Sequence, residues 1–125
     1  TGGLTVLNTL PTVPADWKGG GTAEILAHPN GRWLYVSNRG PDSIGVFRID
    51  DDGHLIAVEI APTGVKEPRG MDIDPTGRWL VVGGQNSDEV AVLSIDSTNG
   101  TLKPSSKIGG IGKPVCVLFT RSQRH

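Results

Sequence analysis

The chain repeats itself over 23 positions without a gap, at an offset of 46 residues, and this repeat constrains its fold more than any other feature. The first copy, residues 28–50, reads HPNGRWLYVSNRGPDSIGVFRID, and the second, residues 74–96, reads DPTGRWLVVGGQNSDEVAVLSID. Pro68 and Pro114 keep the same offset, so a third, partial copy begins near Pro114. A period of this length is typical of folds in which each repeat is one supersecondary unit that packs against its neighbours.

Each repeat predicts four short β-strands that are closed by turn chemistry. The predicted strands cover residues 24–27, 32–37, 44–49 and 55–60 in the first copy, and 71–73, 78–82, 90–95 and 102–107 in the second. The segment Arg32 to Ser37 places apolar side chains on both faces of its strand. Such a sheet must be covered on both sides, as a blade is between two other blades.

Four antiparallel strands in 46 residues predict an all-β fold, the β-propeller. Propellers close with about four to eight blades, so this chain, covering two to three, cannot close alone. We expect an outer strand of a preceding blade in residues 1–16, blades in 17–63 and 64–112, and the first strand of the closing blade in 113–125. Either the chain is part of a longer polypeptide, or several copies assemble into a ring.

Composition excludes several classes of partner. The chain has 12 basic and 13 acidic side chains and a net charge of −1, which favours neither nucleic acid nor an anionic membrane. No apolar run approaches the roughly 18 residues of a membrane helix. The one cysteine, Cys116, lies in an apolar run and is expected to fill core space. A single cysteine and no signal-like stretch favour a cytoplasmic location.

Three stretches resemble a known family. AEILAHPNGRWLYVSNRGPDSIGVFRID, PRGMDIDPTGRWLVVGGQNSDEVAVLSID and KPVCVLF are similar to the C-terminal part of the lactonase family of seven-bladed propellers. That family includes bacterial 6-phosphogluconolactonases and fungal carboxymuconate lactonising enzymes. The resemblance implies a seven-bladed ring of about 320 residues, most of it N-terminal to Thr1. The YVSN strand also resembles the YVTN-type propellers of surface proteins, which are not enzymes.

Blade topology decides which side chains can share a site. Successive strands run in opposite directions, so the loops after the second and fourth strands of each blade open at one end. The turns at residues 28–31 and 50–53 open at the other end. The candidates at the first end are Lys18, Glu24, Asn38, Arg39, Asp42, Arg69, Gln85 and Asn86.

The resemblance implies lactone chemistry, which needs a proton carrier and cations for an anionic substrate and its oxyanion. Glu24 is the candidate proton carrier, and Arg39 and Arg69 are the candidate cations. The other five candidates are expected to contact substrate. A structural alternative pairs Glu24 with an arginine of a neighbouring blade and lets Arg39 brace its loop against Asp42. Asn38 and Asp42 also suit turn formation.

Histidine spacing predicts no metal site, and no cofactor is expected. His28 matches Asp74 in the next repeat and lies in a turn at the wrong end for catalysis. Trp33 and Trp79 recur at one blade position, which indicates packing between blades. The expected function is hydrolysis of a small anionic sugar lactone such as 6-phosphogluconolactone. The alternatives are carboxymuconate lactonisation and a non-catalytic binding propeller.

Overall fold

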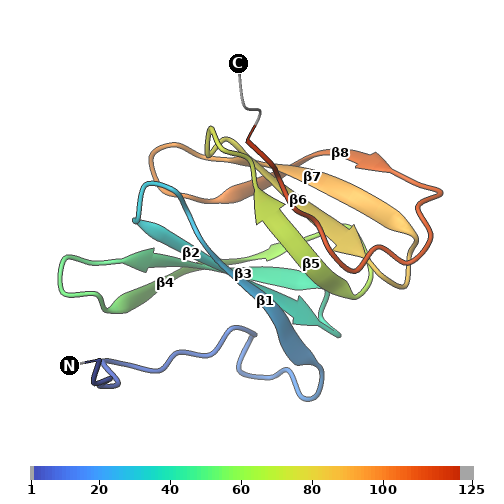
Figure 1. The fold of residues 1–125 in the computed structure, drawn as a ribbon. Helices are drawn as coiled ribbons and strands as arrows, with labels where there is room; N and C mark the ends of the chain where they lie inside the picture. Colours follow the sequence, from blue (N-terminus) through green and yellow to red (C-terminus); the bar gives the residue numbers. More distant parts are fainter. Residues whose placement is uncertain (1, 122–125) are drawn as a thin grey trace.

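The computed structural model describes residues 2–121, which form two four-stranded antiparallel sheets (Figure 1). The first sheet has the order β1-β2-β3-β4, with β1 at Gly21–Ala27, β2 at Trp33–Arg39, β3 at Ser43–Ile49 and β4 at Leu55–Pro62. The second repeats it as β5 (Pro68–Ile73), β6 (Trp79–Gly84), β7 (Glu89–Ile95) and β8 (Leu102–Ile108). The prediction of an all-β fold with four-stranded blades is confirmed.

The first strand of each sheet begins three residues earlier than predicted. β1 begins at Gly21 and β5 at Pro68, and each contains a register shift near its start, between Thr22 and Ile25 and between Pro68 and Gly70. A β-bulge disturbs the alternation of side chains while pairing continues beyond it. Periodicity therefore identifies only the regular part of these strands.

The core lies between the two sheets, and β5 packs against both β1 and β2. Tyr35, Ile44 and Val46 of the first sheet are completely buried, as are Leu80 and Leu93 of the second. Figure 1 shows the sheets stacked, with β5 close to β1 and the outer strands β4 and β8 diverging. This arrangement makes each sheet a layer whose inner surface is covered by the other.

Hydrogen bonds tie the two sheets at several levels. The Nε2 atom of His28 lies 2.8 Å from the Gly77 carbonyl oxygen, and the Tyr35 hydroxyl donates to the Gly100 carbonyl at 2.8 Å. The Leu102 N–H donates to Glu59 Oε1 at 2.7 Å. Burial raises the pKa of Tyr35, and the negative charge of Glu59 raises it further, so the phenol stays protonated and donates.

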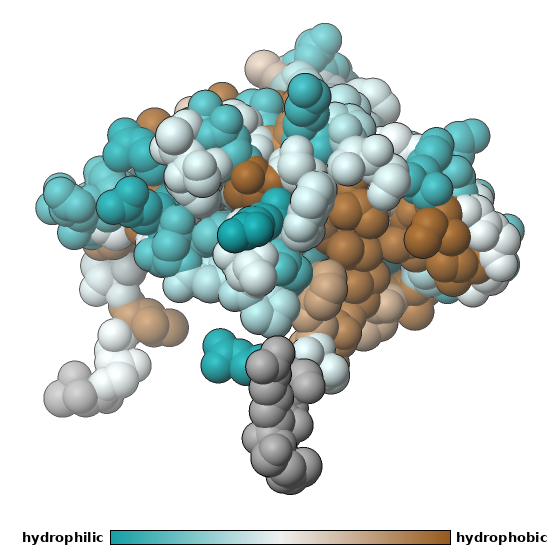
Figure 2. All heavy atoms as spheres, turned by 90° about the horizontal axis from the view of Figure 1, so that it is seen from above, coloured by the Kyte–Doolittle hydropathy of each residue, from teal (hydrophilic) through white to brown (hydrophobic). Residues whose placement is uncertain are grey.

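The recurring tryptophans have different surroundings. Trp33 is 3% exposed and packs on Gly100 of the second sheet, as predicted for a residue between blades. Trp79 occupies the same position on the outer face of the second sheet and is 40% exposed. Figure 2 shows apolar side chains gathered over one part of the surface seen from above. The outer faces thus carry apolar side chains that further blades would cover.

The predicted strands at the two ends of the chain do not form within the described residues. Residues 2–16 pass along the first sheet, where the Asn8 amide bonds with the backbone of Leu55 in both directions. Residues 113–121 pass beside β5, and the Phe119 N–H donates to Asp72 Oδ2 at 2.7 Å. A strand needs a neighbour to complete its ladder, so the assignment of both segments to further blades stays a prediction. Residues 122–125 lie outside the described range.

The expectation that Cys116 fills core space is wrong for the described chain, because Cys116 is exposed. It lies in the segment beside β5, where residues 2–121 provide no third sheet to cover it. The described residues also contain no helix long and apolar enough to cross a membrane.

Candidate functional site

The loops that were predicted to share one end of the blades do lie together. The Thr63 N–H, in the loop between β4 and β5, donates to the Asp42 carbonyl in the turn between β2 and β3. The same loop accepts hydrogen bonds from the turn between β6 and β7, where the Asn86 N–H donates to Lys66. Three connections from two sheets therefore form one continuous surface, and we call this surface the loop end.

Glu24 lies in the irregular part of β1, next to a hollow of about 170 Å³. Its backbone N–H donates to Ser37 Oγ at 3.0 Å, which holds the bulge against β2. Within residues 2–121 its half-buried carboxylate has no hydrogen bond or ion pair, so the predicted pairing with an arginine is not seen in this range.

Arg39 ends β2 beside the start of β1. Its Nη2 donates to the Thr22 carbonyl at 3.3 Å, and its Nε is buried without a partner among the described residues. The alternative in which Arg39 braces Asp42 is not the contact found, because the guanidinium bonds to β1 instead. Among the described residues the other donors of this guanidinium have no partner, and donors in such a fork suit an anion.

Asn38 is 1% exposed, and its side chain works inside the blade. Its Nδ2 donates to the Thr12 carbonyl at 2.7 Å and to Ser43 Oγ at 3.3 Å, while its Oδ1 is buried without a partner. These bonds tie the N-terminal segment to the end of β2. The structural use of Asn38 is thus visible, and its contact with substrate stays a prediction.

Asp42 also has a structural use. Its Oδ1 accepts the Glu67 N–H at 2.9 Å, and both residues have left-handed backbone conformations, with φ of 51° and 56°. Non-glycine residues adopt this conformation rarely, and usually in turns that local hydrogen bonds stabilise.

Arg69 lies in the irregular part of β5 and is exposed. Its Nη1 lies 3.5 Å from Gln85 Oε1, and the Gln85 N–H donates to the Glu67 carbonyl at 3.1 Å. Asn86 is exposed in the same turn. The structure therefore places Arg69 beside the turn that carries Gln85 and Asn86.

Lys18 is exposed in the turn that precedes β1. This turn packs on the β2–β3 connection, since a Cβ on Gly40 would lie 3.2 Å from the Gly20 Cα and 3.5 Å from the Trp17 ring. Lys18 thus belongs to the loop end, although no contact joins it to the other candidates in the described residues.

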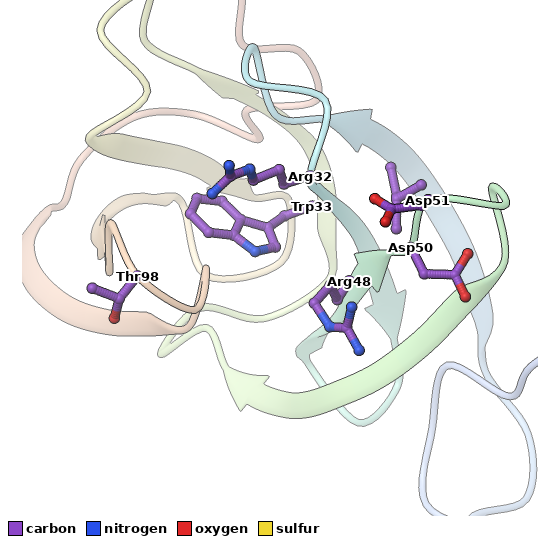
Figure 3. Close-up of a pocket in the computed structure, with 7 residues that line it drawn as sticks. Arg32, Trp33, Arg48, Asp50, Asp51 and Thr98 are labelled. Carbon is purple, nitrogen blue, oxygen red and sulfur yellow. The ribbon is translucent and has the colours of Figure 1, made fainter.

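The opposite end has a larger hollow of about 320 Å³ that sequence reasoning missed. Figure 3 shows its lining, with Thr98 from the β7–β8 turn and the other labelled residues from the first sheet and its turns. The labelled lining residues are Arg32, Trp33, Arg48, Asp50, Asp51 and Thr98. The hollow forms where turns of the two blades meet. The sequence did not predict it, because the pattern within one repeat does not show which turns of neighbouring blades lie together.

Asp50, Asp52 and His54 lie close together at this same end, with potential ligand atoms within 4.8 Å of one another. Asp50 Oδ1 accepts the N–H groups of Asp52 and His54 at 3.0 and 2.8 Å. These bonds are those of a turn in which an aspartate side chain caps the backbone, and they account for the cluster.

Two stacked four-stranded antiparallel sheets, with their first strands side by side and their loops joined at one end, define consecutive blades of a β-propeller. Residues 1–119 match the model of the family described as "Lactonase, 7-bladed beta-propeller". The chain belongs to this lactonase family.

Relatives and solved structures agree with the family. A 6-phosphogluconolactonase of Yersinia pestis (strain Pestoides F) is 37% identical over 70 residues, which are 55% of this chain and 21% of that protein. A 6-phosphogluconolactonase of Serratia proteamaculans is 36% identical over 74 residues, which are 58% of this chain and 22% of that protein. The chain thus spans about a fifth of the length of these curated relatives.

Two solved structures superpose on most of the chain. A protein from Lactobacillus plantarum matches with a TM-score of 0.82 and 37% identity over 86% of this chain and 32% of that one. The periplasmic gluconolactonase of Pseudomonas aeruginosa matches with a TM-score of 0.81 and 32% identity over 86% of this chain and 31% of that one.

Proposed function

We propose that a complete propeller containing these two blades hydrolyses a small anionic sugar lactone, such as 6-phosphogluconolactone. The observation that carries the proposal is the loop end, where Arg39, Arg69 and Glu24 come from adjoining strands and the Glu24 carboxylate has no partner within residues 2–121. The relatives named 6-phosphogluconolactonase support this substrate class, and the solved structure named gluconolactonase supports the coarser class of sugar lactones.

The reaction opens an ester. A water molecule attacks the lactone carbonyl while Glu24 accepts one of its protons, and a tetrahedral oxyanion forms. The bond between the carbonyl carbon and the ring oxygen then breaks, and the proton passes to that oxygen, which leaves a hydroxy acid. Arg39 and Arg69 hold the anionic group of the substrate and stabilise the oxyanion.

Each group has a physical reason for its role. A guanidinium forms paired hydrogen bonds with phosphate or carboxylate, and Arg69 is exposed enough to reach a ligand. Gln85 lies 3.5 Å from Arg69 and limits the directions in which its side chain points. Glu24 has no competing partner within residues 2–121, so its carboxylate is free to bind the attacking water.

The test measures hydrolysis of 6-phosphogluconolactone and of the uncharged gluconolactone by the complete propeller. Replacement of Arg69 by alanine should lower kcat/KM for the phosphorylated lactone by about 10²-fold. Arg78→Ala is the matched control, because Arg78 is exposed in the β5–β6 turn at the opposite end. If the wild-type propeller hydrolyses neither lactone, the proposal is wrong, and a binding propeller becomes the better description.

The remaining blades come either from the rest of a longer polypeptide or from other copies of the chain, and the loop end needs them to close around a substrate. A cytoplasmic location is proposed on the single cysteine, Cys116, which cannot pair within the chain. Fractionation of cells that produce the protein tests it, and recovery from the periplasm, as named for the Pseudomonas aeruginosa protein, would overturn it.

A further inference from the structure

One hydrogen bond of the loop end occurs twice, 46 residues apart. Asp42 Oδ1 accepts the Glu67 N–H at 2.9 Å, and Asp88 Oδ1 accepts the Lys113 N–H at 2.9 Å. All four residues have left-handed backbones, with φ between 46° and 56°. The bond therefore belongs to the repeat, and we call it the loop clamp.

In each blade the clamp joins the turn between the second and third strands to the segment that follows the fourth strand. Its acceptor and donor are 25 residues apart in the sequence, and each adopts a backbone conformation that costs a non-glycine residue free energy. A charge-assisted bond from a backbone N–H to a carboxylate offsets that cost, since it is stronger than a bond between neutral groups.

The first clamp holds a peptide that is also held from the other blade. The Glu67 N–H is bound by Asp42 of the first blade, and the Glu67 carbonyl accepts the Gln85 N–H of the second blade at 3.1 Å. Pro68, which follows, is fully buried, and its ring fixes its own φ. Arg69 is the next residue, so contacts with both blades fix the position of its backbone.

Gln85 contacts both the backbone of this loop and the side chain of Arg69. Its backbone N–H holds Glu67, and its Oε1 lies 3.5 Å from Arg69 Nη1. If Asp42 released the Glu67 N–H, the entry to β5 would lose its anchor to the first blade, and the Arg69 guanidinium would move relative to Arg39 and Glu24. A displacement of about 1 Å in a positioning group can cost about 10²-fold in rate.

We propose that Asp42 is a positioning residue that sets the place of Arg69 through the clamp on Glu67. The role differs from the substrate contact expected from sequence, because the Asp42 carboxylate acts on the backbone of the neighbouring loop. The proposal rests on the proposed function, in which Arg69 binds the anionic lactone.

The second clamp provides a matched control. In the first clamp, Arg69 lies two residues after Glu67. In the second clamp the equivalent position, two residues after Lys113, is the apolar Val115. Loss of either clamp should perturb the fold to a similar degree, but only loss of the first should disturb the guanidinium.

The experiment compares three variants of the complete propeller. Asp42→Gly removes the acceptor while glycine tolerates the positive φ, Asp42→Asn retains an acceptor oxygen at the same position, and Asp88→Gly is the control. Amide hydrogen exchange at Glu67 and Lys113 reports whether each clamp has opened. The kinetic measurement is kcat/KM for 6-phosphogluconolactone, in the wild-type background and in the Arg69→Ala background.

We expect Asp42→Gly to lower kcat/KM about 10-fold to 10²-fold in the wild-type background and to have little further effect once Arg69 is alanine, because the two changes remove one interaction. Asp42→Asn should restore most of the activity, and Asp88→Gly should retain it. If Asp42→Gly does not fold, Asp42→Ser takes its place, since a hydroxyl of shorter reach weakens the same bond.

Three results would overturn the proposal. The first is unchanged kcat/KM in Asp42→Gly although Glu67 exchanges faster. The second is an equal loss in the wild-type and Arg69→Ala backgrounds, which marks a general structural effect. The third is a wild-type propeller that hydrolyses no lactone, which refutes the proposed function together with this role. The first two leave the proposed function standing, so the two failures can be told apart.

Discussion

Removal of the Tyr35 hydroxyl should weaken the contact between the two blades. The hydroxyl is buried and donates to the Gly100 carbonyl at 2.8 Å, and no other hydrogen bond to this carbonyl is found in residues 2–121. Tyr35→Phe leaves the carbonyl buried without a donor, which costs about 1–3 kcal/mol of the free energy of unfolding. Phenylalanine keeps the ring, so little is lost in packing.

The same residue predicts how stability depends on alkaline pH. Burial, assisted by the charge of Glu59, raises the pKa of Tyr35 above its ordinary value of 10.0. Above about pH 10 the unfolded chain loses the phenolic proton while the folded chain keeps it, so the free energy of unfolding falls as pH rises, by up to about 1.4 kcal/mol per pH unit. Tyr35→Phe should abolish this component. Glu59→Gln should make the decline end at a lower pH and the total loss smaller, because without the neighbouring charge the pKa of Tyr35 in the folded chain is raised less, while the start of the decline is set by the unfolded chain.

The assay is urea denaturation of the complete propeller at neutral pH and at several values above pH 9, followed by far-ultraviolet circular dichroism. The difference between wild type and Tyr35→Phe should shrink as pH rises, because the wild type alone loses the tyrosine contribution. The reasoning is refuted if Tyr35→Phe unfolds at the same urea concentration as wild type at neutral pH, or if both proteins show the same alkaline slope.

Two further predictions concern the blade junction and acid stability. Gly100→Ala should lower the free energy of unfolding by about 2–4 kcal/mol and Gly110→Ala by about 1 kcal/mol, measured by thermal or urea unfolding. Both glycines have φ of 76°, but only a Cβ at Gly100 would meet another residue, lying 2.5 Å from the Trp33 ring. Equal losses in the two variants would contradict this contact. Desolvation raises the pKa of Asp74, but bonds from Thr76 and from three backbone N–H groups outweigh it and lower the pKa below 3.8, so stability should be lost as pH falls through that lowered value. Asp74→Asn should flatten the acid limb of a pH titration of the unfolding midpoint, and an unchanged limb would refute the assignment.

Periodicity predicted the strands well because each one is a short apolar run between turn residues, and such a signal lies within one repeat. It missed the first residues of β1 and β5, where bulges replace alternation. It also could not predict that Trp79 would be exposed while Trp33 is buried. The two tryptophans have the same sequence context, and their burial depends on which blades lie beside them.

The candidate site was predictable as a set of loops, because strand direction alone determines the end at which they open. The uses of Asn38 and Asp42 were not predictable, since their partners Thr12 and Glu67 lie 26 and 25 residues away in the sequence. The repeat contained one usable signal, because Asp42 and Asp88 recur at its offset. The hollow around Arg48 had no such signal, since Ser94 takes the equivalent place in the second blade.

We propose that a complete propeller hydrolyses a lactone at the loop end of these blades, with Glu24 as the proton acceptor. The most direct test is the kcat of Glu24→Gln in the complete propeller, measured by pH-stat with saturating 6-phosphogluconolactone. Glutamine keeps the size of the side chain but cannot take the proton, so the account predicts a fall in kcat of about 10²-fold or more with little change in KM. A kcat equal to that of the wild type would contradict the account.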